Sequence, residues 1–149
     1  MRAGEPAADR LADAVGRAMY AQDNASRALG MVLEEIRPGH ARMRMAVRDD
    51  MINGHDLCHG GLIFTLADSA FAFACNAGNQ VTLAAGAEIH FMSPAKKGET
   101  LVAVARERAS AGRSGIYDVE VSEHASGRLV ALFRGRARRM DGKIVEGAS

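Results

Sequence analysis

The spacing of apolar residues predicts four elements in the first half of the chain. From Pro6 to Gln22, apolar residues recur every three or four positions between charged ones, which predicts an amphipathic helix. Leu29–Ile36 predicts a short strand. His40–Val47 alternates arginine with methionine, as expected for a strand with one solvent-facing side. Leu62–Asn76 is a long, nearly uninterrupted apolar run and predicts a buried helix.

In the second half of the chain the apolar residues recur with a different period, and this pattern predicts strands only. Four stretches suit strands, and turn residues such as Ser93-Pro94 and Ser126-Gly127 separate them. Because the strands are consecutive and joined by turns, an antiparallel sheet is favoured over alternating parallel units. The predicted fold class is therefore α+β. The four stretches are Val81–Met92, Leu101–Arg108, Ile116–Glu123 and Leu129–Arg138.

Length and composition narrow the class of protein. The 149 residues suit one domain, read here as 1–149 with an N-terminal helix within 1–25 and a tail at 139–149. A net charge of +1 gives no global signature for nucleic acid, and no apolar run is long enough to span a membrane. No export signal is apparent, and Cys58 and Cys75 lack the spacing of a disulfide framework. We expect a soluble, cytoplasmic protein.

The small net charge conceals a segregation of charge. Residues 1–95 carry 8 basic and 11 acidic side chains (8 − 11 = −3), whereas residues 96–149 carry 11 basic and 7 acidic ones (11 − 7 = +4). Between Arg48 and Lys96 there is no lysine or arginine, yet Asp68 lies in the middle of the apolar helix. Burying a carboxylate is unfavourable unless it is paired or its pKa rises. Asp68 therefore either bonds to hydroxyls such as Thr65 or Ser69, faces a solvated cleft, or is catalytic.

The start of the same helix offers a second chemical group. Helix N-termini present unpaired N–H groups, and Gly60-Gly61 would let an acyl group approach them closely. An N–H that polarises a carbonyl, with a carboxylate to attack it or activate water, is the minimum equipment for acyl-transfer hydrolysis. Gly60 and Asp68 are eight residues apart, about 12 Å along a helix. We therefore expect an active site that spans a homodimer interface, where two antiparallel helices meet.

Neighbouring residues allow more than one interpretation. His55, Cys58 and His59 form an H-x-x-C-H cluster, but a closed metal site needs a fourth ligand that the sequence does not indicate. His59 is better read as orienting the turn or a substrate. Asn53 before Gly54 is either a turn residue or a ligand for the reactive water or the thioester.

The stretch INGHDLCHGGLIFTLADSAFAFACN, Ile52–Asn76, closely resembles the signature of hotdog-fold acyl-CoA thioesterases of the phenylacetic acid degradation (PaaI) type. The HGG motif followed by an acid eight residues after its first glycine is specific to this group. The likeness continues through FMSP with GETL, through GRSGIYD and through ALFRG, and so covers nearly all of the chain after the N-terminal helix. It implies a central helix wrapped by a curved antiparallel sheet, and a homodimer that assembles into a homotetramer.

The resemblance also implies residue roles and a substrate. Asp68 matches the nucleophile or general base, Gly60 the amide that polarises the thioester carbonyl, and His59 and Asn53 lie beside it. No metal or cofactor is implied. One departure is that the hydroxyl which assists the acid in related enzymes is missing, or displaced to Thr82. The residues matched to the CoA part of the substrate are Phe91, Met92, Ser93, Pro94, Lys96, Lys97, Arg113 and Ser114.

The function expected from these observations is hydrolysis of an arylacetyl-CoA, such as phenylacetyl-CoA or hydroxyphenylacetyl-CoA, to the free acid and CoA. Two alternatives remain open at this point. The chain has the residue types of an acyl-thioester hydratase or dehydratase, which needs an acid and a histidine for proton abstraction. It is also compatible with a non-catalytic module that binds acyl-CoA.

Overall fold

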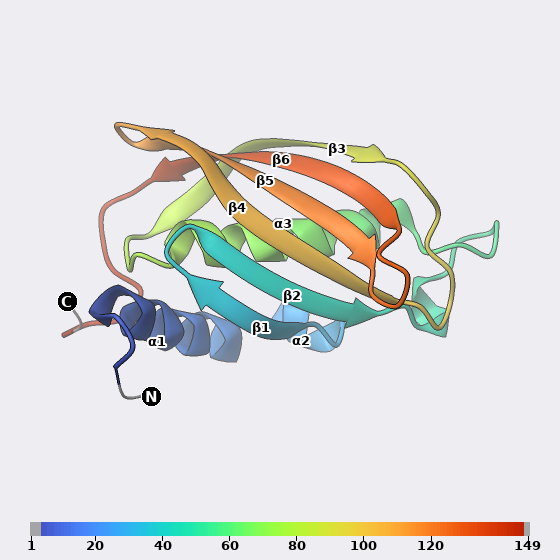
Figure 1. Ribbon diagram of the computed structural model, residues 1–149, viewed down its shortest axis with the longest axis horizontal. Helices are drawn as coiled ribbons and strands as arrows, with labels where there is room; N and C mark the ends of the chain where they lie inside the picture. The colour runs from blue at the N-terminus through green and yellow to red at the C-terminus, as the bar shows by residue number, and fades with distance from the viewer. Residues whose placement is uncertain (1–3, 148–149) are drawn as a thin grey trace.

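The computed structural model describes residues 4–147 and contains one sheet, a 16-residue N-terminal helix followed by a short 5-residue helix, and a 17-residue helix against the sheet (Figure 1). No helix in this part of the chain is long and apolar enough to cross a membrane. The elements in chain order are α1 (Ala7–Gln22), α2 (Asn24–Ala28), β1 (Val32–Arg37), β2 (His40–Ala46), the 3-10 turn η1 (Asp49–Met51), α3 (Gly60–Asn76), β3 (Thr82–Phe91), β4 (Thr100–Ala111), β5 (Ser114–Glu123) and β6 (Leu129–Arg139).

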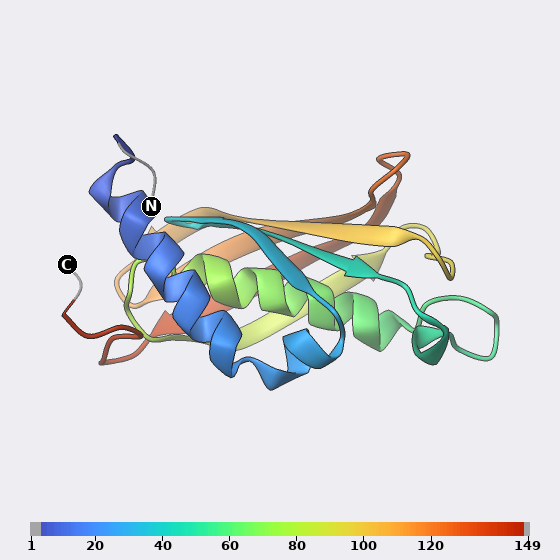
Figure 2. The ribbon, with the colours of Figure 1, turned by 90° about the horizontal axis from the view of Figure 1, so that it is seen from below.

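The six strands form a single antiparallel sheet in the order β1-β2-β4-β5-β6-β3. Register shifts interrupt every pairing except that of β2 with β4, and such irregularities bend and twist strands. The curved sheet wraps around α3, which lies against its concave face (Figure 1, Figure 2). This arrangement confirms the predicted α+β class and the hotdog architecture that the resemblance implied.

The core forms where α3 meets the sheet. Phe71 and Phe73 are almost fully buried, and Phe71 packs against Tyr117 and Phe133 with ring centroids 5.6 and 5.8 Å apart. Gly135 on β6 makes room for this ring, since a Cβ at that position would lie 2.7 Å from two of the Phe71 carbons. The close approach of helix and sheet at this point fixes the position of α3.

One stripe of α3 is not covered by the sheet. Gly61 is exposed, and Thr65, Asp68, Ala72 and Cys75 are partly exposed. These residues recur every three or four positions and therefore share one face of the helix. Apart from Asp68 they are small, so this face, here called the α3 stripe, lets another surface approach the helix closely.

The N-terminal helix predicted from Pro6 to Gln22 is confirmed, but a second short helix that was not predicted follows it. Helix α1 ends at Gln22, and the chain turns at Asp23 into α2, which extends to Ala28. Asp23 is the cause, because its carboxylate caps α2 by accepting from the Ser26 N–H at 3.0 Å and the Ser26 hydroxyl at 2.6 Å.

Element boundaries differ from the predictions by a few residues elsewhere. Helix α3 begins at Gly60 rather than Leu62, because His59 caps it. Strand β1 begins at Val32, since α2 and its turn occupy the preceding residues. The predicted tail loses Arg139 to β6, and residues 148–149 lie outside the described residues.

The contact of Gly135 with Phe71 yields a test of the core. Gly135→Ala is expected to destabilise the fold by about 1–3 kcal/mol through overpacking. The midpoint of thermal unfolding should then fall by roughly 3–10 °C. Gly78→Ala is the matched control, because nothing lies within 4 Å of the added methyl group. Equal midpoints for the two variants would contradict the steric account, and adding Phe71→Leu to Gly135→Ala should recover part of the loss.

Candidate active site

The first turn of α3 has one free N–H group. His59 is the N-cap, and its Nδ1 accepts from the Gly61 N–H at 3.0 Å, while its carbonyl accepts from the N–H groups of Leu62 and Ile63. Within residues 4–147, the Gly60 N–H has no hydrogen-bond partner. Because Nδ1 accepts, the proton of a neutral His59 ring is on Nε2. The positive end of the helix dipole thus presents a single open donor, at Gly60.

A cleft adjoins Gly60. The Phe91 ring covers Gly60 so closely that a Cβ there would lie 3.0 Å from Phe91 Cζ. A side chain at this position would press against the ring, whereas glycine leaves the ring in place beside the amide. The cleft has a volume of about 340 Å³ and is lined by Asn53, Leu57, Cys58, Gly60, Ile63, Phe91, Met92, Ser93, Pro94 and Ala95. The fold therefore brings together six of the predicted site residues.

Asn53 organises the loop before α3. Its side-chain oxygen accepts from the N–H groups of His55 and Leu57, at 2.9 and 3.2 Å. This is the turn role that the sequence suggested. The amide nitrogen of the same side chain has no protein partner within the described chain, so Asn53 can also donate a hydrogen bond in the cleft that it lines.

Asp68 lies two turns further along α3, on the α3 stripe. Its carboxylate makes no hydrogen bond or ion pair with residues 4–147. Thr65 donates to the Gly61 carbonyl at 2.8 Å, and the Ser69 hydroxyl lies 2.8 Å from that of Ser26. The alternative that these hydroxyls satisfy Asp68 is therefore wrong. Burial raises the pKa of the Asp68 carboxyl above its usual range, and the negative charge of Asp23 adds to this effect.

A single protomer does not bring Gly60 and Asp68 together. They belong to one continuous helix, and eight residues separate them by about 12 Å. The acid faces outward from the stripe, whereas the cleft lies at the end of the helix. The geometric condition drawn from the sequence thus holds in the structure.

The residues predicted to meet CoA divide into two groups. Phe91, Met92, Ser93 and Pro94 line the cleft, with Phe91 and Met92 53% and 58% exposed. The Ser93 hydroxyl already donates to the Leu129 carbonyl at 2.6 Å. Beyond the cleft, the Lys96 N–H donates to Glu99 at 2.6 Å, and the Lys97 ammonium pairs with Asp49 at 2.9 Å. Asp49 raises the pKa of Lys97.

Arg113 and Ser114 lie far from this cleft within one protomer. Ser114 pairs with Arg138, and Arg138 pairs with Leu83 at the start of β3, whereas Phe91 is at its end. Eight residues of strand separate Leu83 from Phe91, about 26 Å. Arg113 there pairs with Asp141 at 3.3 Å.

Two other candidates from the sequence, the Thr82 hydroxyl and the H-x-x-C-H cluster, do not form part of a site in the described structure. Thr82 donates its hydroxyl to the Gln80 carbonyl at 2.9 Å and is held by Asn76, eight residues beyond Asp68 on α3. It is therefore no substitute hydroxyl for Asp68 in the same protomer. The H-x-x-C-H cluster is also dispersed, and no three His, Cys, Asp or Glu side chains within residues 4–147 gather as metal ligands.

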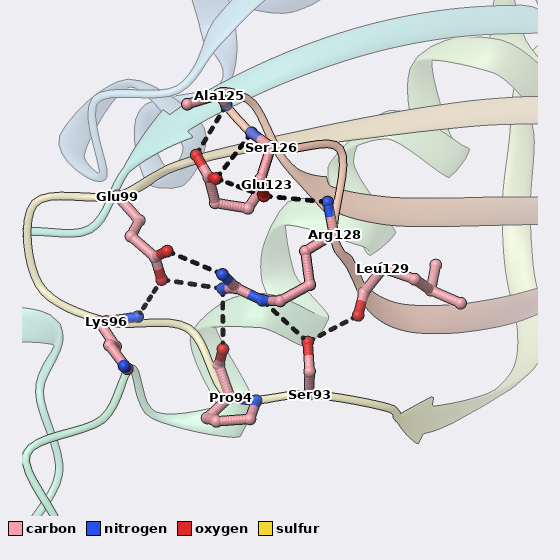
Figure 3. Close-up of polar contacts among 9 residues, drawn as sticks. All are labelled: Ser93, Pro94, Lys96, Glu99, Glu123, Ala125, Ser126, Arg128 and Leu129. Carbon is pink, nitrogen blue, oxygen red and sulfur yellow. Dashed lines mark hydrogen bonds and ion pairs between the residues drawn. The ribbon is translucent and has the colours of Figure 1, made fainter.

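Sequence reasoning missed the residues that hold this region in place. Asp23 and Ser26 fasten α2 beside Asp68, and Glu99 and Arg128 fasten the segment after β3 (Figure 3). Arg128 and Glu99 are 29 positions apart and follow no common motif. The one local signal was Asp23 followed three residues later by Ser26, which is typical of a helix cap.

Comparison with known proteins identifies the family of this chain. The sequence profile of the Thioesterase superfamily matches residues 55–130. Acyl-coenzyme A thioesterase PaaI of Escherichia coli is 41% identical over 127 residues, which cover 85% of this chain and 90% of that protein.

Solved structures lead to the same family. The structure of the Escherichia coli PaaI protein from the phenylacetic acid degradation operon has a TM-score of 0.88 at 38% identity, and the match covers 91% of this chain and 97% of that one. A mutant structure of phenylacetic acid degradation protein PaaI from Thermus thermophilus has a TM-score of 0.76 at 36% identity and covers 79% and 100%. The chain therefore belongs to the thioesterase superfamily, as a hotdog-fold thioester hydrolase related to the acyl-CoA thioesterase PaaI.

Proposed function

We propose that this protein hydrolyses arylacetyl-CoA thioesters, such as phenylacetyl-CoA or hydroxyphenylacetyl-CoA, at a site shared by two copies of the chain. The observation that carries the proposal is that α3 holds both an open N–H donor at Gly60 and an unpaired carboxylate at Asp68. The chain is related to Escherichia coli PaaI, a protein from the phenylacetic acid degradation operon. This relation supports an arylacetyl group as the acyl part of the substrate.

Two surfaces of the protomer support a homodimer. Strand β3 is at the edge of the sheet, pairs only with β6 and is exposed along most of its length. An exposed edge strand is a template for pairing with another chain. The α3 stripe, which the sheet leaves uncovered, consists of small residues apart from Asp68. Antiparallel pairing of two copies through β3 and α3 would set Gly60 of one copy opposite Asp68 of the other. We propose that such dimers associate into a homotetramer.

In this arrangement the thioester carbonyl accepts the Gly60 N–H. Negative charge develops on that oxygen when the tetrahedral intermediate forms, and an oriented amide at a helix N-terminus stabilises it. Asn53 donates its free amide nitrogen to the carbonyl or to the attacking water. His59 keeps the Gly61 N–H occupied and so fixes the turn around Gly60.

Asp68 supplies the other half of the reaction in one of two ways. As a base, it takes a proton from water while the water oxygen bonds to the carbonyl carbon, and it returns that proton to the sulfur when the C–S bond breaks. As a nucleophile, its oxygen displaces the CoA thiolate and forms an anhydride, which water then hydrolyses. After a single turnover in oxygen-18 water, label in Asp68 establishes the anhydride route, because it arises only when water attacks the Asp68 carbonyl of the anhydride.

The CoA arm is proposed to leave the site along the cleft, past Phe91 to Pro94 and toward Lys96 and Lys97. The end of the sheet that carries Arg113 and Ser114 would come from the second copy, since antiparallel pairing places it near the cleft. CoA carries several phosphates, and arginine and lysine are suited to bind them. We further propose that the enzyme acts in the cytoplasm, where its free thiols, Cys58 and Cys75, stay reduced.

Asp68→Asn tests the catalytic assignment. The amide neither takes a proton nor attacks a carbonyl, so kcat for phenylacetyl-CoA should fall by at least about a hundredfold. Release of the free thiol measures this directly. Retained turnover would refute the role of Asp68.

The same variant should keep its fold and assembly. Because the pKa of Asp68 is raised in the folded state, the folded protein favours the protonated carboxyl. The contribution of Asp68 to the free energy of unfolding is therefore full at low pH and is lost as the pH rises through the folded-state pKa. Asp68→Asn removes this loss, so its thermal midpoint should match or exceed that of the wild type at neutral pH, with the advantage shrinking in acid.

Asp23→Asn tests the electrostatic setting of Asp68. The substitution removes a negative charge that raises the pKa of Asp68, while asparagine still caps α2. Because the ionised carboxylate is the active form, the acidic limb of kcat/KM against pH should move to lower pH. Asp9→Asn, on the first turn of α1, is the matched control and should leave the limb in place. A limb that does not move in Asp23→Asn would contradict the coupling.

The acyl specificity is tested by thiol release from a panel of CoA thioesters. We expect phenylacetyl- and hydroxyphenylacetyl-CoA to give a higher kcat/KM than benzoyl- or straight-chain acyl-CoAs. A preference for short straight chains would overturn the arylacetyl assignment and leave thioester hydrolysis intact. An enoyl-CoA in the same panel should not be hydrated.

A further inference from the structure

Arg128 ties the end of the sheet to the wall of the cleft. Its guanidinium donates two N–H bonds to the Glu99 carboxylate, at 3.0 and 3.1 Å. It also donates through Nε to the Ser93 hydroxyl at 3.2 Å and through Nη2 to the Pro94 carbonyl at 3.0 Å (Figure 3). One side chain thus holds both ends of the segment from Ser93 to Glu99.

The turn that carries Arg128 is itself held rigidly. The Glu123 carboxylate accepts from the N–H groups of Ala125 and Ser126 and from the Ser126 hydroxyl, at 2.7 to 2.9 Å. The Ser126 hydroxyl in turn accepts from the Arg128 N–H at 3.1 Å. These bonds lower the pKa of Glu123, and the bond from Arg128 lowers that of Glu99. Both carboxylates therefore stay ionised at neutral pH.

The held segment reaches the open amide through the backbone. Ser93, Pro94 and Ala95 form one wall of the cleft. The Ala95 carbonyl accepts from the Cys58 N–H at 2.8 Å, two residues before Gly60. A chain of hydrogen bonds thus extends from the β5–β6 turn, through Arg128 and the cleft wall, to the residues that position Gly60.

We propose that Arg128, with Glu99, is a positioning residue that sets the cleft wall for the part of a CoA thioester next to the carbonyl. The inference rests on the proposed function and deepens it. The arrangement needs arginine, since a planar guanidinium bonds to a carboxylate, a hydroxyl and a carbonyl at once, whereas lysine offers a point charge. These contacts engage four of the five guanidinium N–H groups of Arg128. In this proposal Arg128 acts on the substrate through the wall and not by touching a phosphate.

The test compares Arg128→Gln with the wild type on two thioesters of the same acyl group. The substrates are the CoA thioester and the pantetheine thioester, which lacks the nucleotide and its phosphates. If Arg128 positions the wall, KM should rise about tenfold for both substrates, with kcat changed much less. A rise confined to the CoA thioester would show direct phosphate binding and overturn the proposal.

Two further variants separate positioning from loss of stability. Arg134→Gln breaks a comparable two-bond pair, with Asp118 at 2.6 and 2.9 Å, away from the cleft, and should leave KM unchanged. Arg128→Lys keeps the charge, and its KM should lie between that of Arg128→Gln and that of the wild type. Assays are run well below the thermal midpoint of every variant.

The outcomes distinguish this inference from the proposed function. If the wild type releases no thiol from arylacyl-CoA, the proposed function fails. If the wild type is active and Arg128→Gln matches it in KM for both substrates, only the role of Arg128 is refuted.

Discussion

The burial of α3 within the concave sheet is the constraint on which the rest of the structure depends. Phe71 and Phe73 anchor the helix, and Gly135 lets it lie close to β6. Because the helix cannot move without exposing these rings, its N-terminus and its uncovered stripe are fixed in space. Gly60 and Asp68 are therefore presented from a rigid support, as a preorganised site requires.

That same rigidity prevents a protomer from completing the proposed site alone. A straight helix keeps Gly60 and Asp68 about 12 Å apart, and no loop motion shortens this distance. The protein tolerates a carboxylate of raised pKa on a mostly apolar helix, together with an N–H at the helix start that no group within residues 4–147 satisfies. Groups left unsatisfied by their own fold are expected where function requires them.

The fold was largely predictable because its signals are local. Apolar periodicity predicted α3 and the strands, and turn residues between consecutive strands predicted antiparallel pairing. Strand order was not predictable, since β3 pairs with β6 and not with its neighbour β4. The end of the first helix at Gln22 was predicted, but α2 was missed because its five residues are too few to show an apolar period.

For the proposed site, the amino-acid pattern singled out Asp68 and Gly60, because an acid in an apolar helix and glycines at its start are unusual locally. The resemblance to the family added Asn53 and His59. The spacing of Gly60 and Asp68 in the sequence also supplied the distance that led us to propose a site shared by two copies. Only the tertiary structure showed four other features. These are the free Gly60 amide, the unpaired carboxylate of Asp68, the wide separation of Arg113 from the cleft, and the hydrogen bonds by which Arg128 holds the cleft wall. Each depends on contacts between residues distant in sequence, and these contacts form only when the sheet closes around the helix.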